Sequence, residues 1–101
     1  MKNTADLKTG LKMYSETENS LLIDVRSEGE YADGHVGGSL NIPLDKLPKA
    51  VMDGELPKEK TLFVYCRSGA RSKRACIFLD KSGYETVNIG GVMGYDGPLE
   101  K

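Results

Sequence analysis

The feature that most constrains the fold is the segment TLFVYCRSGARSKRACIFL at residues 61–79, in which an apolar run leads through a short loop into a helical pattern. Residues 61–65 are rich in β-forming side chains and predict a strand that is buried on both faces. The apolar residues of 71–83 recur at helical spacing, and Gly83 suits the position just beyond a helix end. A buried strand followed at once by a helix is typical of a parallel sheet.

The rest of the chain continues this alternation of apolar runs and helical segments. We expect strands at residues 20–25, 37–44 and 85–89, helices at residues 3–16, 27–35 and 44–54, and a turn with a single helical turn at residues 90–101. Asn3 is expected to cap the first helix, with Asp6 in its first turn. Ser27 and Glu30 have the spacing of a capping box. The alternation favours an α/β fold with a mostly parallel sheet.

Length and composition set the class of protein. The 101 residues are expected to form a single domain, 1–101, with its core in about residues 15–100. The net charge of -1 argues against nucleic acid or a membrane surface as a partner. No apolar run approaches the ~18 residues of a membrane span, and the N-terminal segment lacks the apolar stretch of a secretory signal. We therefore predict a cytoplasmic protein.

The chain has two cysteines and one histidine. Cys66 and Cys76 are ten residues apart, with a helix predicted between them, so their Cα atoms are expected to lie beyond the ~7 Å reach of a disulfide. His35 has no second histidine or cysteine at a metal-ligand spacing. The sequence therefore predicts two free thiols, and neither a metal site nor a cofactor.

Cys66 has the position of a nucleophile, directly after the predicted strand and just before a helix. Open α/β sheets bind their ligands at this edge, beyond the carboxyl ends of the strands. A helix N-terminus and the nearby cations Arg67 and Arg71 both favour the thiolate form. The residues between the arginines are small: Ser68, Gly69 and Ala70. Such a loop can turn successive N–H groups inward and stabilise an anionic sulfur.

The alternative is a buried, inert cysteine that only ends a core strand. This interpretation suits Cys76, which flanks the apolar face of its helix. It leaves the small residues and the arginines around Cys66 without a purpose. We therefore predict that Cys66 is catalytic and that Cys76 packs in the core.

Three segments together resemble the single-domain rhodanese family of sulfurtransferases. They are LLIDVRSEGEYADGHVGGSLNIPL at 21–44, CRSGARS at 66–72 and GYETVNIGGVMGY at 83–95. The resemblance covers nearly the whole chain. It implies a three-layer fold, in which a mostly parallel sheet of five strands has helices on both faces.

The resemblance also implies a reaction. Cys66 would take a sulfane sulfur from a small anionic donor, thiosulfate or a polysulfide or persulfide, and become a persulfide. A thiophilic acceptor, cyanide or a thiol, would then remove the sulfur in a second half-reaction. The persulfide-binding and donor-binding residues would be Arg67, Ser68, Gly69, Ala70 and Arg71.

Other polar residues of the first resembling segment are expected to have structural roles. Asp24 and Arg26 are similar to a polar pair of the family that holds loops near the site. His35 is expected to stabilise a turn. Glu30 is expected either to pair with Arg26, four residues earlier, or to be a solvated charge.

Two other functions fit parts of the pattern. Cysteine phosphatases have five residues between cysteine and arginine, whereas Cys66 and Arg71 are separated by four. A non-catalytic rhodanese-like module, binding or regulatory, would not need Cys66, but a persulfide carrier that delivers sulfur to a partner protein would use the same residues. The cations Arg71, Lys73 and Arg74 could then dock that protein, or simply form a solvated helix face.

Overall fold

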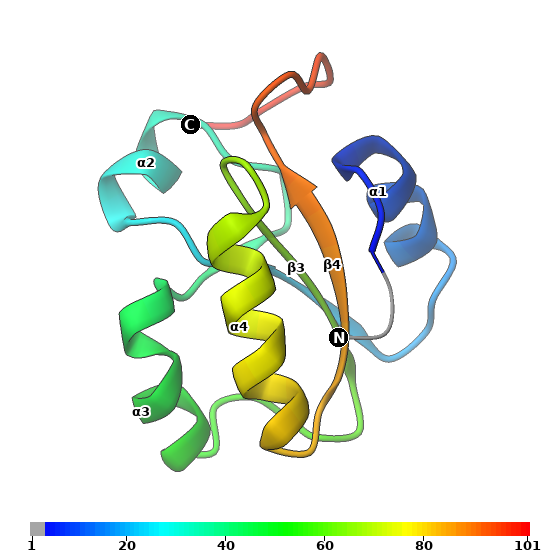
Figure 1. Cartoon of the computed structure of the whole chain (residues 1–101). Coiled ribbons are helices and arrows are strands. Elements are labelled where there is room, and N and C mark those ends of the chain that lie inside the picture. Colours follow the sequence, from blue (N-terminus) through cyan, green and yellow to red (C-terminus); the bar gives the residue numbers. More distant parts are fainter. Residues whose placement is uncertain (1–3) are drawn as a thin grey trace.

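The computed structural model describes residues 4–101, which fold around one parallel sheet (Figure 1). The strands are β1 (Ser20–Asp24), β2 (Leu40–Asn41), β3 (Thr61–Cys66) and β4 (Glu85–Gly91). The helices are α1 (Leu7–Ser15), α2 (Glu28–Asp33), the 3-10 helix η1 (Leu44–Lys46), α3 (Leu47–Met52) and α4 (Ala70–Lys81). The strand order is β2-β1-β3-β4, and all neighbours are parallel. All carboxyl ends therefore meet at one edge of the sheet.

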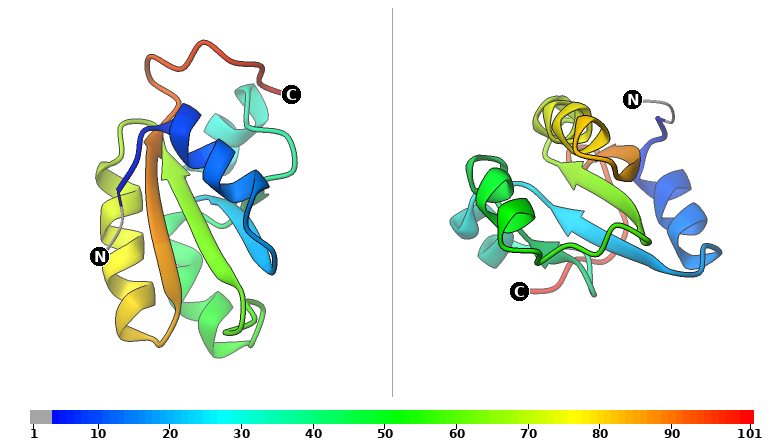
Figure 2. Two further views of the ribbon diagram at one scale, coloured as in Figure 1. Left: turned by 90° about the vertical axis from the view of Figure 1, so that its right-hand side faces the viewer. Right: turned by 90° about the horizontal axis from the view of Figure 1, so that it is seen from below.

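Helices cover both faces of this sheet, which confirms the α/β class and the three-layer arrangement. Figure 2 shows α3 and α4 on one face and α1 on the other. The side chains of β3 alternate between two apolar clusters, with Leu62 and Val64 on the α4 side and Phe63 on the α1 side. All residues of β3 after Thr61 are buried, as expected for a central parallel strand.

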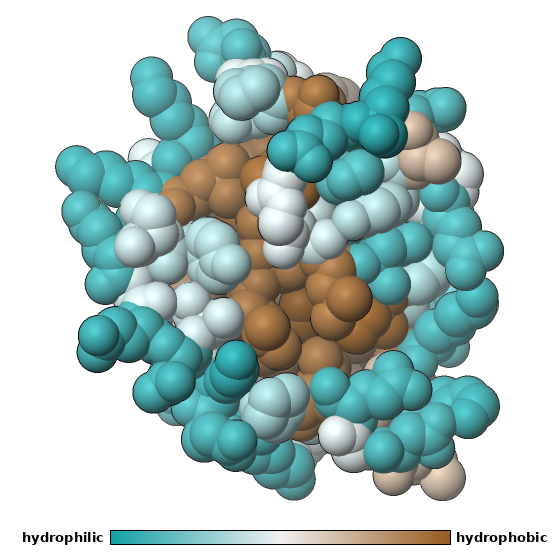
Figure 3. Space-filling model, turned by 180° about the vertical axis from the view of Figure 1, so that it is seen from behind, coloured by the Kyte–Doolittle hydropathy of each residue, from teal (hydrophilic) through white to brown (hydrophobic). Residues whose placement is uncertain are grey.

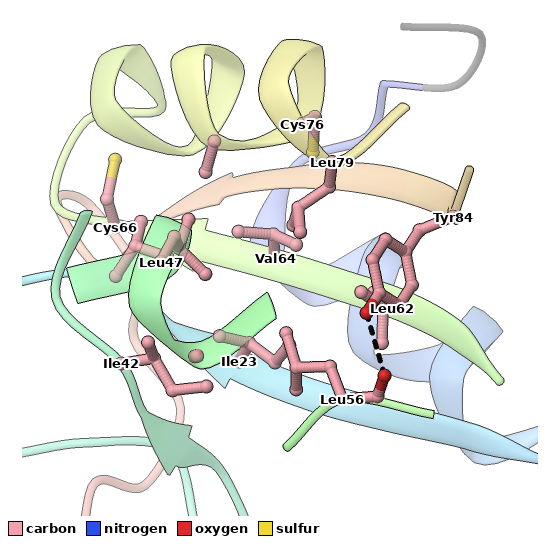
Figure 4. Packing of buried hydrophobic residues seen from close by; sticks show 13 residues of the cluster. Ile23, Ile42, Leu47, Leu56, Leu62, Val64, Cys66, Cys76, Leu79 and Tyr84 are labelled. Atoms are coloured by element: carbon pink, nitrogen blue, oxygen red, sulfur yellow. Dashed lines mark hydrogen bonds between the residues drawn. The ribbon is translucent and has the colours of Figure 1, made fainter. Parts of the chain in front are cut away.

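The cluster beneath α3 and α4 is drawn in Figure 4. Leu47, Val64 and Leu79 are fully buried in it. Its polar group is satisfied, because the Tyr84 hydroxyl donates to the carbonyl of Leu56 at 2.7 Å. Cys66 lies at one end of this cluster, beside the loop that leads into α4. The core thus positions the strand end that carries the cysteine.

Within residues 4–101 the sheet has four strands, one fewer than the resemblance implies. The N-terminal segment contributes a single bridge, Thr4 with Asn88 of β4, and the Ala5 N–H donates to the Asn88 carbonyl at 2.9 Å. The chain then turns at once into α1, whose cap is Asp6: its Oδ1 accepts the Thr9 N–H at 2.9 Å. Asp6 was expected in the first turn of the helix and instead caps it, whereas Asn3, the expected cap, lies outside the described residues.

The capping box of α2 is confirmed. Ser27 Oγ accepts the Glu30 N–H at 3.2 Å, and Glu30 Oε1 accepts the Ser27 N–H at 3.0 Å.

Residues 90–101 do not form the helical turn that was expected there. Instead, Glu100 pairs with His35, N–H to carbonyl in both directions, at 2.8 and 2.7 Å. The C-terminal segment is held by backbone pairing rather than by a helix.

One face of the molecule exposes a group of apolar side chains (Figure 3). Viewed from behind, apolar side chains gather in a central area framed by polar ones (Figure 3). Leu40 of the short edge strand β2 and Leu99 near the C-terminus are exposed. No helix within residues 4–101 combines the length and the apolar character that a membrane crossing needs.

Candidate active site

Cys66 is the last residue of β3 and stands at the carboxyl edge of the sheet. The residue is only 1% exposed. Its Sγ accepts two backbone hydrogen bonds, from the N–H of Gly69 at 3.0 Å and from the N–H of Ser72 at 3.4 Å. The sulfur therefore occupies the centre of a turn that folds back over it.

The local backbone explains why the donors face the sulfur. Gly69 has φ 100°, a left-handed conformation that glycine adopts without strain, and it immediately precedes α4. No side chain caps this helix, so the first N–H groups need another acceptor. Cys66 Sγ supplies it for the Ser72 N–H. The positive end of the helix dipole thus faces the sulfur and favours its anionic form.

These contacts control the ionisation of Cys66. Burial opposes the charged form and would raise the pKa of the thiol. Hydrogen bonding with the Ser72 hydroxyl and with the N–H groups of Ser72, Gly69 and Ser68 outweighs burial, so the pKa of Cys66 lies below its ordinary value. Cys76 shows the opposite case: burial raises the pKa of its thiol to about 11, and its side chain packs in the core as expected. Both thiols are free.

Ser72 and Asn88 form a buried polar network behind the sulfur. Ser72 Oγ lies 3.5 Å from Cys66 Sγ and donates to Asn88 Oδ1 at 2.7 Å. Asn88 Oδ1 also accepts the Gly90 N–H at 3.0 Å. Both side chains are buried. The network ties the first turn of α4 to β4 and fixes the hydroxyl that contacts the thiol.

Sequence patterns assign no role at the site to Asn88, and none to Ser72 beyond its place at the end of the segment CRSGARS. Two signals point to them. Ser72 is in the first turn of the helix that follows Cys66, where a hydroxyl can face a bound anion. Asn88 is a polar residue within an otherwise apolar strand centre, and such a residue needs a buried partner.

The end of β4 supports the other side of the loop. The N–H of Val92 donates to the carbonyl of Cys66 at 3.0 Å, and the N–H of Met93 donates to that of Arg67 at 2.9 Å. A Cβ atom on Gly91 would collide with the Arg67 carbonyl. Glycine is therefore required at this position by the close approach of two backbones.

Arg71 is engaged by a carboxylate, which corrects the expectation for Glu30. The guanidinium donates from Nη1 to Glu30 Oε1 at 2.7 Å and from Nη2 to Oε2 at 2.9 Å. The hydrogen bonds from Arg71 are the main reason that the pKa of Glu30 falls to about 2. Arg26, the expected partner, instead forms a buried ion pair with Asp24, Nη2 to Oδ2 at 2.7 Å. The four-residue spacing therefore predicted the wrong partner, because the fold brings Arg71, far away in the sequence, next to Glu30.

The remaining expected residues take different places around the site. Arg26 also donates to the carbonyl of Gly34 at 2.7 Å, so the Asp24–Arg26 pair supports the turn after α2. The His35 ring stacks on Tyr31 with 3.7 Å between ring centroids, away from the sulfur contacts described above. Arg67, Ser68 and Ala70 of the loop are exposed, and so are Lys73 and Arg74 of α4. The structure thus brings the 66–72 loop together and places Asp24, Arg26 and His35 around the turn that follows α2.

Comparisons with known proteins agree with this geometry. Residues 7–96 match the family described as "Rhodanese-like domain". The chain is 36% identical over 97 residues to a sulfurtransferase of Allochromatium vinosum, covering 94% of this chain and 89% of that protein. It is 36% identical over 96 residues to the putative sulfurtransferase YtwF of Bacillus subtilis, covering 94% of this chain and 88% of that protein.

A solved structure gives the same result for the fold. The structure described as "rhodanese with anions from E. coli" superposes with a TM-score of 0.71 at 34% identity, covering 81% of this chain and 98% of that one. The family match leaves residues 1–6 and 97–101 outside it. This chain belongs to the rhodanese-like family and is homologous to sulfurtransferases.

Proposed function

We propose that this protein is a sulfurtransferase that carries a sulfane sulfur as a persulfide on Cys66. The observation that carries the proposal is the pair of backbone N–H groups, from Gly69 and Ser72, that point at Cys66 Sγ from the start of α4. Donors in this arrangement stabilise a thiolate, which is the nucleophilic form of the side chain. The names of the relatives from A. vinosum and B. subtilis support the same reaction class.

The reaction has two half-reactions. The Cys66 thiolate attacks the sulfane sulfur of the donor, the S–S bond of the donor breaks, and the remaining anion leaves; with thiosulfate this anion is sulfite. The acceptor then attacks the outer sulfur of the Cys66 persulfide, and Cys66 leaves as a thiolate. The sulfur atom moves with no net oxidation, so no further reactant is required.

The loop residues have separate parts in this scheme. Ser68, Gly69 and Ala70 let the backbone turn around the sulfur, and Gly69 provides the shortest contact to it. Arg67 is an exposed cation at the loop that attracts an anionic donor. Arg71 attracts the donor less strongly than its sequence position suggests, because Glu30 neutralises it. We infer that thiosulfate or a polysulfide or persulfide is the donor, and that a thiol or cyanide is the acceptor.

The two other functions considered for this sequence are less well supported. A phosphatase needs a free arginine to bind the phosphoryl group, whereas both terminal nitrogens of Arg71 contact Glu30. A non-catalytic module does not require the contacts that lower the pKa of Cys66. A persulfide carrier for a partner protein shares the loading step and stays a prediction. The cytoplasm, which the sequence predicts, keeps cysteines reduced and suits this chemistry.

Mass spectrometry of the intact protein tests the proposal. Wild type, Cys66→Ser and Cys76→Ser are incubated with thiosulfate or with polysulfide and then with cyanide. We expect a gain of one sulfur atom on wild type and on Cys76→Ser, none on Cys66→Ser, and removal of the sulfur by cyanide. Absence of the adduct with both donors, or equal loss in both cysteine variants, would overturn the proposal.

A further inference from the structure

A charged cleft adjoins the loop around Cys66 at the carboxyl edge of the sheet. Its volume is about 580 Å³. Its floor is apolar, formed by Val25 directly after β1 and by Pro43 and Leu44 after β2. Its rim carries charged side chains of both signs: Glu28, Asp45, Lys46, Arg71 and Arg74. The cleft is large enough for a small organic molecule and combines an apolar base with a polar rim.

The cleft and the sulfur loop share one residue. Arg71 lines the cleft and also belongs to the first turn of α4, whose Ser72 N–H contacts Cys66 Sγ. Figure 1 shows α2 and the first turn of α4 on the same side of the molecule. Residues of α2, η1 and α4 line the cleft. Cys66 itself does not line the cleft, so the cleft and the sulfur loop meet at Arg71.

The rim charges differ in how they are engaged. Lys46 pairs with Glu28 at 3.1 Å, but both side chains are more than half exposed, so a charged ligand can replace either partner at small cost. Within residues 4–101, the side chains of Asp45 and Arg74 form no hydrogen bond or ion pair. The cleft therefore offers an open carboxylate and an open guanidinium above an apolar floor.

We propose that this cleft binds the sulfur acceptor and that the acceptor is a small zwitterionic thiol, with both an ammonium and a carboxylate group. The ammonium lies beside Asp45, the carboxylate beside Arg74, and the carbon atoms on Val25 and Leu44. This inference rests on the proposed function. The acceptor thiol loses its proton to solvent, and its thiolate attacks the outer sulfur of the persulfide. The S–S bond to Cys66 breaks, which gives a Cys66 thiolate and the acceptor persulfide.

Discharge of the loaded protein tests the proposal. Persulfide-loaded wild type and variants are mixed with L-cysteine, 3-mercaptopropionate, cysteamine, 2-mercaptoethanol or cyanide, and the second-order rate constants for loss of sulfur are measured. Each variant is compared with wild type on the same acceptor, so differences in intrinsic nucleophilicity cancel. L-Cysteine carries both charges and 2-mercaptoethanol carries neither. 3-Mercaptopropionate carries only the negative charge, and cysteamine only the positive charge.

The two open charges have separable effects. Arg74→Ala should slow discharge by L-cysteine and 3-mercaptopropionate about 3- to 10-fold, the range expected for one partly exposed ion pair. It should leave cysteamine, 2-mercaptoethanol and cyanide within about twofold. Asp45→Asn should slow L-cysteine and cysteamine instead. Arg74→Glu should invert the preference between 3-mercaptopropionate and cysteamine relative to wild type.

Matched variants separate the cleft from general charge effects. Lys73→Ala removes the neighbouring cation of α4, which does not line the cleft, and Asp53→Asn removes an anion at the end of α3. Both should discharge like wild type with all five acceptors. The acceptor site would be overturned if Arg74→Ala and Lys73→Ala slowed discharge equally, or if Arg74→Ala and Asp45→Asn both left the rate with L-cysteine unchanged. Either result would leave the proposed function intact. Failure of wild type to load sulfur would overturn the proposed function, and with it this inference.

Discussion

Glu30 and Arg71 are 41 residues apart in the chain, yet they form a two-point ion pair at 2.7 and 2.9 Å beside the sulfur loop. Glu30 also completes the capping box of α2. One carboxylate therefore organises the start of α2 and holds a side chain of α4. It also lowers the net positive charge next to Cys66, where the proposed anionic donor would arrive.

The ion pair makes stability depend on pH in acid. The folded-state pKa of Glu30, about 2, is below the ordinary value of 4.5, so its stabilisation is complete above about pH 5 and is lost as the pH falls towards 2. Glu30→Gln keeps a capping acceptor but removes the charge. Because both side chains are about one-third exposed, we expect the variant to be less stable by at most about 1 kcal/mol at pH 7. Urea unfolding at pH 7, 4 and 2.5 should show that the difference in unfolding free energy between wild type and Glu30→Gln becomes smaller as the pH falls. A difference that stays constant would contradict the low pKa of Glu30.

The same substitution should change loading by thiosulfate. Releasing Arg71 from Glu30 increases the positive charge that a dianionic donor meets, so the second-order rate constant for persulfide formation should rise about 3- to 10-fold at low salt. The increase should diminish at high ionic strength because screening weakens it. Glu28→Gln, which removes a charge elsewhere on α2, serves as the control. Stopped-flow loading rates that rise equally in both variants would exclude a specific effect of the Arg71 pair.

Ser72→Ala should shift the pH profile of the reaction. Loss of the hydroxyl removes a group that helps to keep the pKa of Cys66 below its ordinary value. The acid limb of the loading rate, and the thiolate absorbance near 240 nm, should both move to higher pH, with a rate about 3- to 10-fold lower at pH 7. Ser82→Ala removes a hydroxyl that bonds to the Phe78 carbonyl at the other end of α4 and should leave both curves in place. An unchanged thiolate titration in Ser72→Ala would remove Ser72 from this role.

Gly91 and Gly29 should respond oppositely to alanine. Gly91→Ala forces a methyl group against the Arg67 carbonyl, so we expect a loss of about 2 kcal/mol or more and slower persulfide formation. Gly29 lies within α2 with open space around it, so Gly29→Ala should stabilise the protein by about 0.5–1 kcal/mol. Thermal unfolding distinguishes the two. A Gly91→Ala variant as stable as wild type would show that β4 can shift away from the loop.

Most of the fold and the centre of the site were predictable from sequence. The strand before Cys66 and the helix after it follow from short-range patterns, and so does the capping box at Ser27. Contacts between residues far apart in the chain were harder to predict, because spacing along a helix does not show which side chains the neighbouring elements place beside it. Glu30 was therefore assigned to Arg26 or to solvent rather than to Arg71.

The strand count and the buried network show the same limit. From Thr4 onward, the N-terminal segment forms only the Thr4 bridge, because α1 begins at Leu7. Sequence patterns place a helix start only to within a few residues when several caps are available. Asn88 was predictable as a polar residue in a strand, but its partner Ser72 depends on the register of β4 against β3. Networks of this kind become visible only when strand register is known.

The position of Asn88 has a consequence for how the protein folds. The groups that hydrogen-bond to the Cys66 sulfur, and the asparagine behind them, come from one continuous strand–helix–strand unit, residues 61–91. Closing this unit requires shorter chain loops than pairing β1 with β3, so its entropic cost is lower. We therefore expect the hydrogen-bonding groups around Cys66 Sγ to come together early, as one cooperative unit. The contact between Glu30 and Arg71 forms later, when β1 and α2 pack against this unit. The third of the chain that forms the thiolate site would then also be the part that folds first.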